Sequence, residues 1–223
     1  EELPKQFLYL TNHSTLLQNT VTRTLEFTDS NKLFVVAGQN WRALVDHQVK
    51  QAGNFKESIV ITEPLGRNTG PAIALGISYL LDRAGAKKED SVLICPSDHI
   101  INDVPAYSSA VGNAVKASEK GYISTFGIVP TGPETGFGYL HAGDLNGEGY
   151  CELEEFVEKP DLERAKSYLE DGNYYWNSGM FVFRIGDMMH ALKKHMPLVG
   201  EAAERGYEFL LGSFEDMPSI SID

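Results

Sequence analysis

The alternation of short apolar segments with helical patterns is the feature that most constrains this fold. Three continuous apolar runs of strand length lie in the first half of the chain, at 33–37, 58–62 and 91–95. Strands that are apolar on both faces and alternate with helices are typical of an α/β protein, whose mostly parallel sheet is covered by helices on both faces. Ligands of such sheets bind beyond the carboxyl ends of the strands, which directs attention to the loops after residues 62, 95 and 128.

Helical patterns separate and follow these strands. Ser14 is placed to cap the first helix, and further helices are expected around 41–49, over 69–81 and from Asp103 onward. The second half alternates more strongly between polar and apolar residues, so we expect its strands to extend the sheet and form a lobe over its mouth. These strands are expected at 122–128, 139–142, 150–158 and 179–185, with helices from Asp161 and from Gly186.

The chain is acidic, which limits its partners. Its 223 residues carry 19 Lys and Arg against 31 Asp and Glu, a formal net charge of −12. Such a surface repels phosphate backbones and anionic lipid headgroups, so binding to nucleic acid or to membranes through bulk charge is excluded. A phosphate site has to be local, built from a few cationic side chains or backbone N–H groups.

Composition also bears on location. Cys95 and Cys151 offer no disulfide framework and suit a reducing cytoplasm. No apolar run approaches the 18 residues that a membrane helix needs, and the first residues lack the regions of a signal peptide. The chain begins without Met and stops on an alternating pattern. We therefore expect the chain to be a fragment of a longer protein. The sequence leaves open whether that protein forms a homo-oligomer.

Residues 63–71 form the first motif that could carry chemistry. The segment leaves a strand and enters a helix, whose first N–H groups have no partner within the helix. Glu63 can accept two hydrogen bonds from the N1–H and N2–H₂ edge of guanine, which adenine does not offer. Gly66 and Gly70 allow the backbone to approach a ligand, although the Gly-Lys-Ser/Thr of a P-loop is missing. The competing interpretation is a capped turn with a surface glutamate.

Asp98 marks the second motif, Pro96-Ser97-Asp98-His99, after the strand that ends at Cys95. An aspartate at the carboxyl end of a strand is well placed to hold Mg²⁺ against a phosphate. An aspartate that caps a turn has the same position. His99 alone fits a structural hydrogen-bonding residue better than a metal ligand.

Three later motifs, at 135–140, 156–160 and 176–183, suggest a sugar site. The glycines around Phe137 would let the backbone approach a small ligand. Glu158 can accept from sugar hydroxyls, and Lys159 can neutralise a phosphate. Asn177, at the start of a core strand, could donate to and accept from vicinal hydroxyls. Each motif also has a plain structural interpretation, respectively a glycine-rich hairpin, a solvated ion pair and a buried strand.

Together, the order and spacing of these motifs resemble the bacterial mannose-1-phosphate guanylyltransferase family of sugar-phosphate nucleotidyltransferases. The resemblance covers essentially the whole chain, and Lys5 matches the segment just after the family's glycine-rich loop. The motifs that carry it are Glu63…Gly-Arg-Asn-Thr, Pro96-Ser-Asp-His, Gly136-Phe-Gly-Tyr, Phe156-Val-Glu-Lys-Pro and Trp176-Asn-Ser-Gly-Met-Phe.

The resemblance implies a Rossmann-like (GT-A-like) nucleotidyltransferase catalytic domain over residues 1–223, with a mixed, mostly parallel sheet and a sugar-binding lobe. Such an enzyme makes GDP-mannose and pyrophosphate from GTP and mannose 1-phosphate with Mg²⁺, for polysaccharide biosynthesis. The resemblance assigns catalytic roles at the triphosphate to Lys5, at the metal to Asp98 and at the sugar phosphate to Lys159. It assigns the nucleotide to Glu63, Gly66, Arg67, Asn68 and Thr69, and mannose to Gly138, Glu158 and Asn177.

Two family features fall outside the sequence. The glycine-rich loop with its arginine lies upstream of residue 1, and a second metal-binding aspartate lies beyond residue 223, so we expect the fragment by itself to be inactive. Whether the parent protein has a phosphomannose isomerase domain stays open. The rivals are a nucleotidyltransferase for another NTP or sugar 1-phosphate and a non-catalytic nucleotide-sugar-binding protein. A sugar transferase would need spaced acidic ligands, but His99 and Ile100 follow Asp98.

Overall fold

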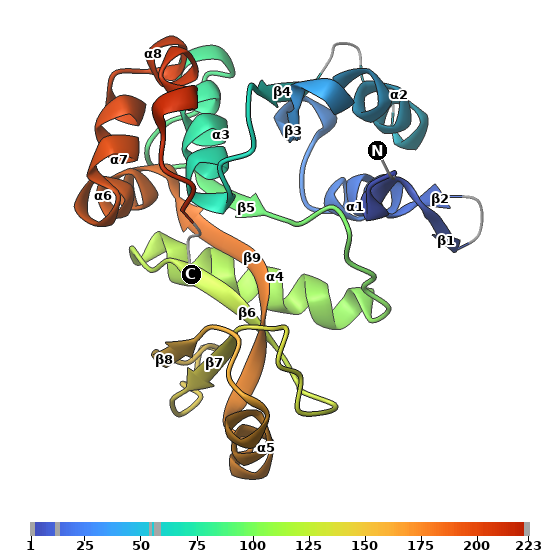
Figure 1. Ribbon diagram of the computed structural model, residues 1–223, viewed down its shortest axis with the longest axis vertical. Helices are drawn as coiled ribbons and strands as arrows, with labels where there is room; N and C mark the ends of the chain where they lie inside the picture. Colours follow the sequence, from blue (N-terminus) through green and yellow to red (C-terminus); the bar gives the residue numbers. More distant parts are fainter. Residues whose placement is uncertain (1–2, 12–13, 54, 56–58, 221–223) are drawn as a thin grey trace. The chain divides into compact units, whose positions relative to one another are not determined.

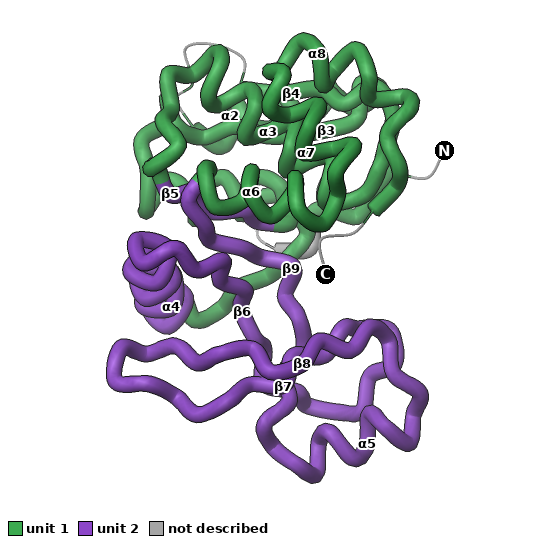
Figure 2. Tube along the Cα trace, turned by 90° about the vertical axis from the view of Figure 1, so that its left-hand side faces the viewer, with its two compact units in different colours: residues 1–90, 96–104, 185–222 green, residues 91–95, 105–184, 223 purple. Residues whose placement is uncertain are grey.

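The chain divides into two compact units (Figure 2). The computed structural model describes residues 3–11, 14–53, 55 and 59–220. Unit 1 comprises residues 1–90, 96–104 and 185–222, and unit 2 comprises 91–95, 105–184 and 223. The prediction of one catalytic domain over 1–223 concerns function and stays a prediction.

Unit 1 combines two short sheets with most of the helices (Figure 1). Strands β3 and β4 pair in parallel, with Gly38 opposite Glu63 at their carboxyl ends. The strands are β1 (Tyr9–Thr11), β2 (Ser14–Thr15), β3 (Val35–Gly38) and β4 (Val60–Glu63). The helices are α1 (Leu16–Thr24), α2 (Arg42–Ala52), α3 (Thr69–Arg83), α6 (Ile185–His195), α7 (Pro197–Glu204) and α8 (Tyr207–Gly212).

Helix α1 begins one residue later than predicted. Thr15, not Ser14, is its N-cap, and Thr15 and Gln18 form a reciprocal capping box. The Thr15 hydroxyl also donates to Gln48 Oε1 on α2 at 2.7 Å, and all three side chains are buried. The cap therefore both starts α1 and ties it to α2.

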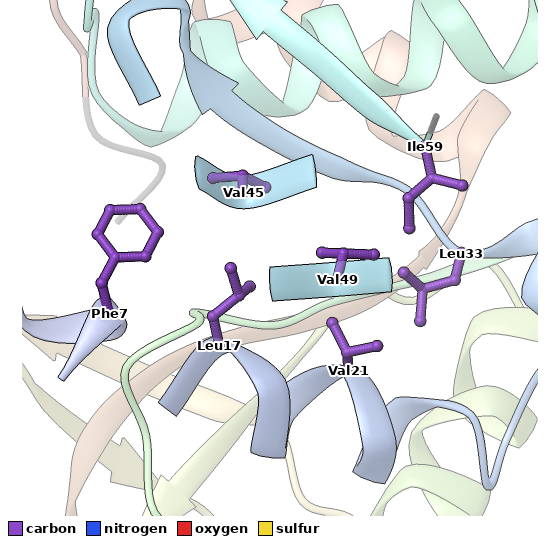
Figure 3. Close-up of a cluster of buried hydrophobic side chains, with 7 residues drawn as sticks. All are labelled: Phe7, Leu17, Val21, Leu33, Val45, Val49 and Ile59. Carbon is purple, nitrogen blue, oxygen red and sulfur yellow. The ribbon is translucent and has the colours of Figure 1, made fainter. Parts of the chain in front are cut away.

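The core beneath β3 and β4 comes from the apolar faces of α1 and α2. Leu17 and Val21 on α1 point toward Val49 on α2 (Figure 3). Full burial of such a side chain stabilises the fold by about 1.5–3 kcal/mol. The buried cluster consists of Phe7, Leu17, Val21, Leu33, Val45, Val49 and Ile59. This core fixes the two strands from whose carboxyl ends the first part of the site is built.

Unit 2 is a mixed sheet with two helices. Its strands run in the order β5–β9–β7–β8, and β6 also pairs with β9. The strands are β5 (Ser91–Ile94), β6 (Ser124–Ile128), β7 (Tyr139–Ala142), β8 (Leu153–Val157) and β9 (Tyr174–Arg184). The helices are α4 (Val104–Glu119) and α5 (Leu162–Asp171). Asp161 caps α5 by accepting from the Arg164 N–H at 2.9 Å, as its position predicts.

The prediction that parallel pairing dominates was wrong. Among the described residues, β3 and β4 form the parallel pair, and the ladders of unit 2 are all antiparallel. Apolar runs report burial on two faces, but they do not report strand direction. Here the long β9 runs opposite to β5, β6 and β7. Second-half strands extend the sheet that contains β5, as predicted, but β3 and β4 pair in a separate sheet and are not part of it.

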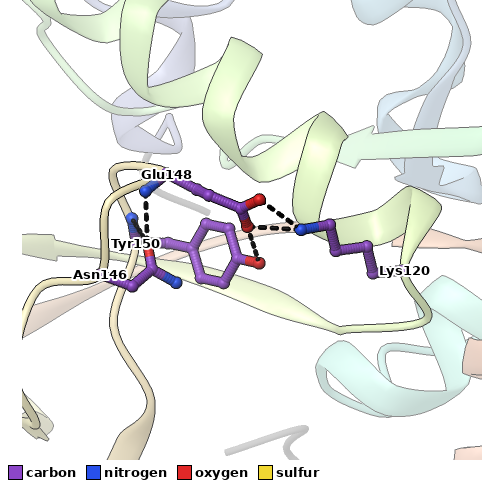
Figure 4. A network of polar contacts seen from close by, with 4 residues as sticks. All are labelled: Lys120, Asn146, Glu148 and Tyr150. Carbon is purple, nitrogen blue, oxygen red and sulfur yellow. Dashed lines mark hydrogen bonds and ion pairs between the residues drawn. The ribbon is translucent and has the colours of Figure 1, made fainter.

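The loop between β7 and β8 is tied to the end of α4 by a surface network (Figure 4). Glu148 accepts from the Lys120 ammonium and, at 2.7 Å, from the Tyr150 hydroxyl. Asn146 Oδ1 accepts from the backbone N–H groups of Glu148 and Tyr150. The hydrogen bond to Glu148 raises the pKa of Lys120. The network orders a long connection without using a core residue.

Candidate functional site

A cavity of about 440 Å³ opens at the carboxyl ends of β3 and β4 in unit 1. This position agrees with the rule for parallel strands. The loop after β4 contributes Glu63, Pro64, Leu65 and Gly66, and Ser97 comes from the segment after β5. Two of the predicted nucleotide residues, Glu63 and Gly66, therefore line one cavity.

Glu63 is the most unusual group in this cavity. Its Oε2 is buried and has no hydrogen-bond partner among the described residues. Burial raises the pKa of the carboxyl group because the charged form loses solvation. An acceptor that stays buried without any donor costs about 1–3 kcal/mol, so this oxygen favours a partner that can donate, either water or a ligand.

The other predicted nucleotide residues of this loop lie outside the cavity lining and form contacts within the protein. Arg67, Asn68 and Thr69 are not among the residues that line the cavity. The Arg67 guanidinium donates to the backbone carbonyl of Glu215. Asn68 caps α3 through its side chain, accepting from the Thr69 N–H at 3.1 Å. Their assignment to the nucleotide stays a prediction.

The C-terminal segment of unit 1 closes over the start of α3. The Ile220 N–H donates to the Arg67 carbonyl at 3.2 Å, and the Gly70 N–H donates to the Ile220 carbonyl at 3.0 Å. A Cβ on Gly70 would lie 2.8 Å from the Met196 sulfur, so the glycine permits this close packing. At Gly70, the helix N–H expected to meet a ligand is thus occupied by the chain itself.

Asp98 lies beside Lys5 in unit 1. Lys5 Nζ is 3.6 Å from Asp98 Oδ2, and His99 Nε2 is 3.9 Å from Asp98 Oδ1. Burial is the main cause that lowers the pKa of His99, with Lys5 and Arg23 lowering it further and Asp98 opposing them. His99 is therefore predominantly neutral near pH 7.

The chemistry of Asp98 fits Mg²⁺ as one protein carboxylate among phosphate and water ligands, which is how Mg²⁺ is commonly held. No cluster of three or more His, Cys, Asp or Glu side chains suited to a metal occurs within residues 3–11, 14–53, 55 and 59–220. Asp98 would thus hold the ion only together with substrate phosphates or residues outside these ranges.

The sequence analysis missed the loop after β3. The cavity is also lined by four residues at the end of β3 and after it, namely Gly38, Gln39, Asn40 and Trp41. Trp41 also packs on Phe7, with ring centroids 5.4 Å apart. The signal was available, because the carboxyl-end rule was applied to later strands but not to the strand ending near Ala37.

In unit 2 the three predicted sugar residues come together. The Asn177 N–H donates to the Gly138 carbonyl at 2.8 Å. A Cβ on Gly138 would lie 2.7 Å from the Phe156 ring and 3.0 Å from Glu158 Oε2, so only glycine fits. Asn177 lies inside β9, not at its start as predicted, because Tyr174, Tyr175 and Trp176 extend the strand.

Lys159 forms an ion pair with Glu158, with 2.8 Å between Nζ and Oε1, and both side chains are about half exposed. Its backbone φ is 44°, a strained value for a residue with a side chain. Among the described non-glycine residues, only Asn68, at 70°, also has a positive φ. Asn68 in unit 1 and Lys159 in unit 2 thus both have a strained backbone, and both are predicted site residues.

No helix in the described part of the chain combines the length and apolar character needed to cross a membrane. The class of protein follows from the comparison with known families. Residues 1–209 match the family described as Nucleotidyl transferase. The chain therefore belongs to the nucleotidyl transferase family.

Relatives within this family confirm the predicted resemblance. The mannose-1-phosphate guanylyltransferase of Escherichia coli (strain K12) is 42% identical over 206 residues, which cover 91% of this chain and 42% of that protein. The xanthan biosynthesis protein XanB of Xanthomonas campestris pv. campestris (strain B100) is 42% identical over 208 residues, covering 93% of this chain and 43% of that protein. The chain thus spans less than half the length of these relatives.

A solved structure gives the same result for the fold. A protein described as mannose-1-phosphate geranyltransferase from Thermus thermophilus matches with a TM-score of 0.87 at 33% identity, over 99% of this chain and 63% of that one. The predicted α/β nucleotidyltransferase fold is confirmed.

Proposed function

We propose that the protein to which this chain belongs transfers GMP from GTP to mannose 1-phosphate, giving GDP-mannose and pyrophosphate. The observation that carries the proposal is the buried, unpartnered Oε2 of Glu63 at the cavity, as seen among the described residues. A carboxylate in this state suits the paired N–H donors of guanine. The name of the Escherichia coli relative supports the same substrates.

In this reaction, an oxygen of the sugar phosphate attacks the α-phosphorus of GTP. The new P–O bond forms while the bond from the α-phosphorus to the bridging oxygen breaks, and pyrophosphate leaves with the electron pair. The sugar phosphate is already an anion near neutral pH, so the protein needs no strong base. Catalysis then consists of alignment and charge stabilisation.

Each candidate residue has a role in that scheme. Glu63 and Gly66 hold the base, and Lys5 neutralises the triphosphate. Asp98 holds Mg²⁺, which supplies positive charge against the phosphate oxygens when bound. Arg67, Asn68 and Thr69 complete the nucleotide loop.

On the sugar side, the backbone of Gly138 contacts mannose, and Glu158 and Asn177 hydrogen-bond to it. Lys159 faces the sugar phosphate. The product would serve polysaccharide biosynthesis, as the name of the XanB relative suggests. Neither Cys95 nor Cys151 forms a disulfide in the structure, which supports a cytoplasmic location.

The test is a pyrophosphate-release assay on the full-length protein, with the four NTPs crossed against several sugar 1-phosphates. We expect GTP with mannose 1-phosphate to give the highest kcat/KM. A different preferred pair would overturn the substrate assignment. Tight binding of GDP-mannose without release of pyrophosphate in any combination would identify a non-catalytic binding protein.

A further inference from the structure

The side chain of Asn177 is held by hydrogen bonds within unit 2. Its Oδ1 accepts from the Gly179 N–H at 3.1 Å and from the Thr125 hydroxyl at 3.1 Å. Its backbone N–H is occupied by the Gly138 carbonyl. The amide oxygen has two lone pairs, and two donors of unit 2 face it.

The Gly179 N–H fixes the orientation of the amide. A backbone N–H can only donate, so the atom of Asn177 that faces it must be the oxygen and not the nitrogen. In the part of the chain that the structure describes, the Nδ2 donors have no protein partner, which leaves them for a ligand. Asn177 then acts only as a donor toward the sugar site, whereas the sequence predicted that it both donates and accepts.

Thr125 is the second anchor, and it comes from another strand. It lies on β6, where the pairing with β9 shifts register between Thr125 and Gly127, and Gly127 is aligned with Asn177. The Thr125 hydroxyl is also 3.1 Å from the Met180 carbonyl, so its proton is shared between two acceptors of β9. A valine would have nearly the same shape but could not donate.

We infer that Thr125 is a positioning residue, which holds Asn177 as a hydrogen-bond donor to an oxygen of the sugar phosphate ligand, either a hydroxyl or a phosphate oxygen. The inference rests on the proposed function, since it deepens the role of the same sugar site. Thr125 acts through Asn177 and does not need to touch the ligand.

Binding of GDP-mannose and of GDP, measured by calorimetry on the full-length protein, tests this role. Losing one neutral hydrogen bond should weaken GDP-mannose binding by about three- to ten-fold in Thr125→Val and leave GDP binding unchanged. Thr125→Ser should restore wild-type binding. Thr131→Val, an exposed threonine of the same unit, serves as the matched control. Unchanged GDP-mannose binding in Thr125→Val would overturn the inference.

A double-mutant cycle separates positioning from a general structural role. If Thr125 acts through Asn177, adding Thr125→Val to Asn177→Ala should weaken GDP-mannose binding no further. If the two losses multiply, Thr125 acts independently and the inference fails. The melting temperature of each variant identifies any loss of fold.

A measurement without ligand keeps this inference distinct from the proposed function. The side-chain NH₂ resonance of Asn177, assigned by its absence in Asn177→Asp, should show restricted motion in the wild type and in Thr125→Ser, and greater motion in Thr125→Val. A mobile amide in the wild type contradicts the anchoring. If the amide is rigid but the wild type binds GDP-mannose no better than GDP, the proposed sugar specificity fails instead.

Discussion

Two glutamates, one in each unit, place a carboxylate in a predicted site in different environments. Glu63 in unit 1 has a buried oxygen without a partner among the described residues, and its pKa is raised by burial. Glu158 in unit 2 is half exposed and paired with Lys159. The first is costly in the absence of ligand, while the second is compensated by its neighbour. We expect Glu63 to select its ligand and Glu158 to hold its ligand more weakly.

The two units also share a feature. Asn68 and Lys159 both adopt a positive φ, which costs of order 1–3 kcal/mol for a residue with a side chain. In unit 1 the strained residue starts a long helix, and in unit 2 it follows a strand end. Because local conformational preference disfavours a positive φ at these residues, the surrounding structure must hold the backbone of both predicted loops in place.

The largest effect is expected in unit 1, at Asp98. Asp98→Asn removes a charge needed to hold Mg²⁺ against phosphate, so turnover should fall about 100-fold or more. The fold should survive, because the exposed pair with Lys5 contributes only about 0–1 kcal/mol. Steady-state pyrophosphate release measures the change, with Asp144→Asn as a control for charge alone. Normal turnover in Asp98→Asn would remove Asp98 from the metal site.

In unit 2, Lys159→Met should raise KM for mannose 1-phosphate by about 10- to 150-fold, corresponding to about 1.5–3 kcal/mol for a charge-assisted contact. KM for GTP should change much less. Lys166→Met, which breaks the Lys166–Glu163 ion pair on α5, is the matched control. Equal changes in both KM values would show that Lys159 does not act specifically on the sugar phosphate.

Exchange of the unpartnered carboxylate tests the ligand selectivity of unit 1. Glu63→Gln should weaken GTP binding by about 5- to 150-fold and change ATP binding little, because the amide donor opposes a donor of guanine. Titration calorimetry with both nucleotides measures the ratio. An unchanged ratio would make Glu63 a turn residue and leave guanine to backbone groups between Gly66 and Gly70.

The smallest effect concerns stability. Because the pKa of Glu63 is raised in the folded state, its contribution is most favourable below the ordinary value of 4.5 and is lost as pH rises through the raised pKa. Glu63→Gln without ligand should therefore melt like the wild type near pH 4 and slightly higher near pH 8. Glu158→Gln, which loses an ion pair, should show no such gain. If the difference in melting temperature between Glu63→Gln and the wild type became smaller with rising pH, the burial argument would be contradicted.

Sequence reasoning reached the parts of the site that depend on strand ends. Glu63 follows a short apolar strand, and the carboxyl-end rule placed it at a cavity. The grouping of Gly138, Glu158 and Asn177 was implied by the family resemblance, since these residues are far apart in sequence. Their contacts depend on the β7–β8 and β7–β9 ladders.

Other features could not be read from the sequence. Antiparallel pairing around β9 is a property of long-range connection, which apolar runs do not encode. The extent of β9 depends on pairing partners for Tyr174 to Trp176, so Asn177 was placed too early. The hydrogen bond from the Arg67 guanidinium to the Glu215 carbonyl joins segments that are far apart in sequence, so no local sequence pattern predicts it.

The closure of the C-terminal segment over α3 has a consequence for local opening. The Gly70 amide is bonded to Ile220 and not to a neighbour within its own helix. Its exchange with deuterium therefore requires the end segment to lift away, whereas amides in the middle of α3 exchange only when the helix itself opens. The exchange rate of the Gly70 amide would therefore report how often the segment around Ile220 detaches from the start of α3.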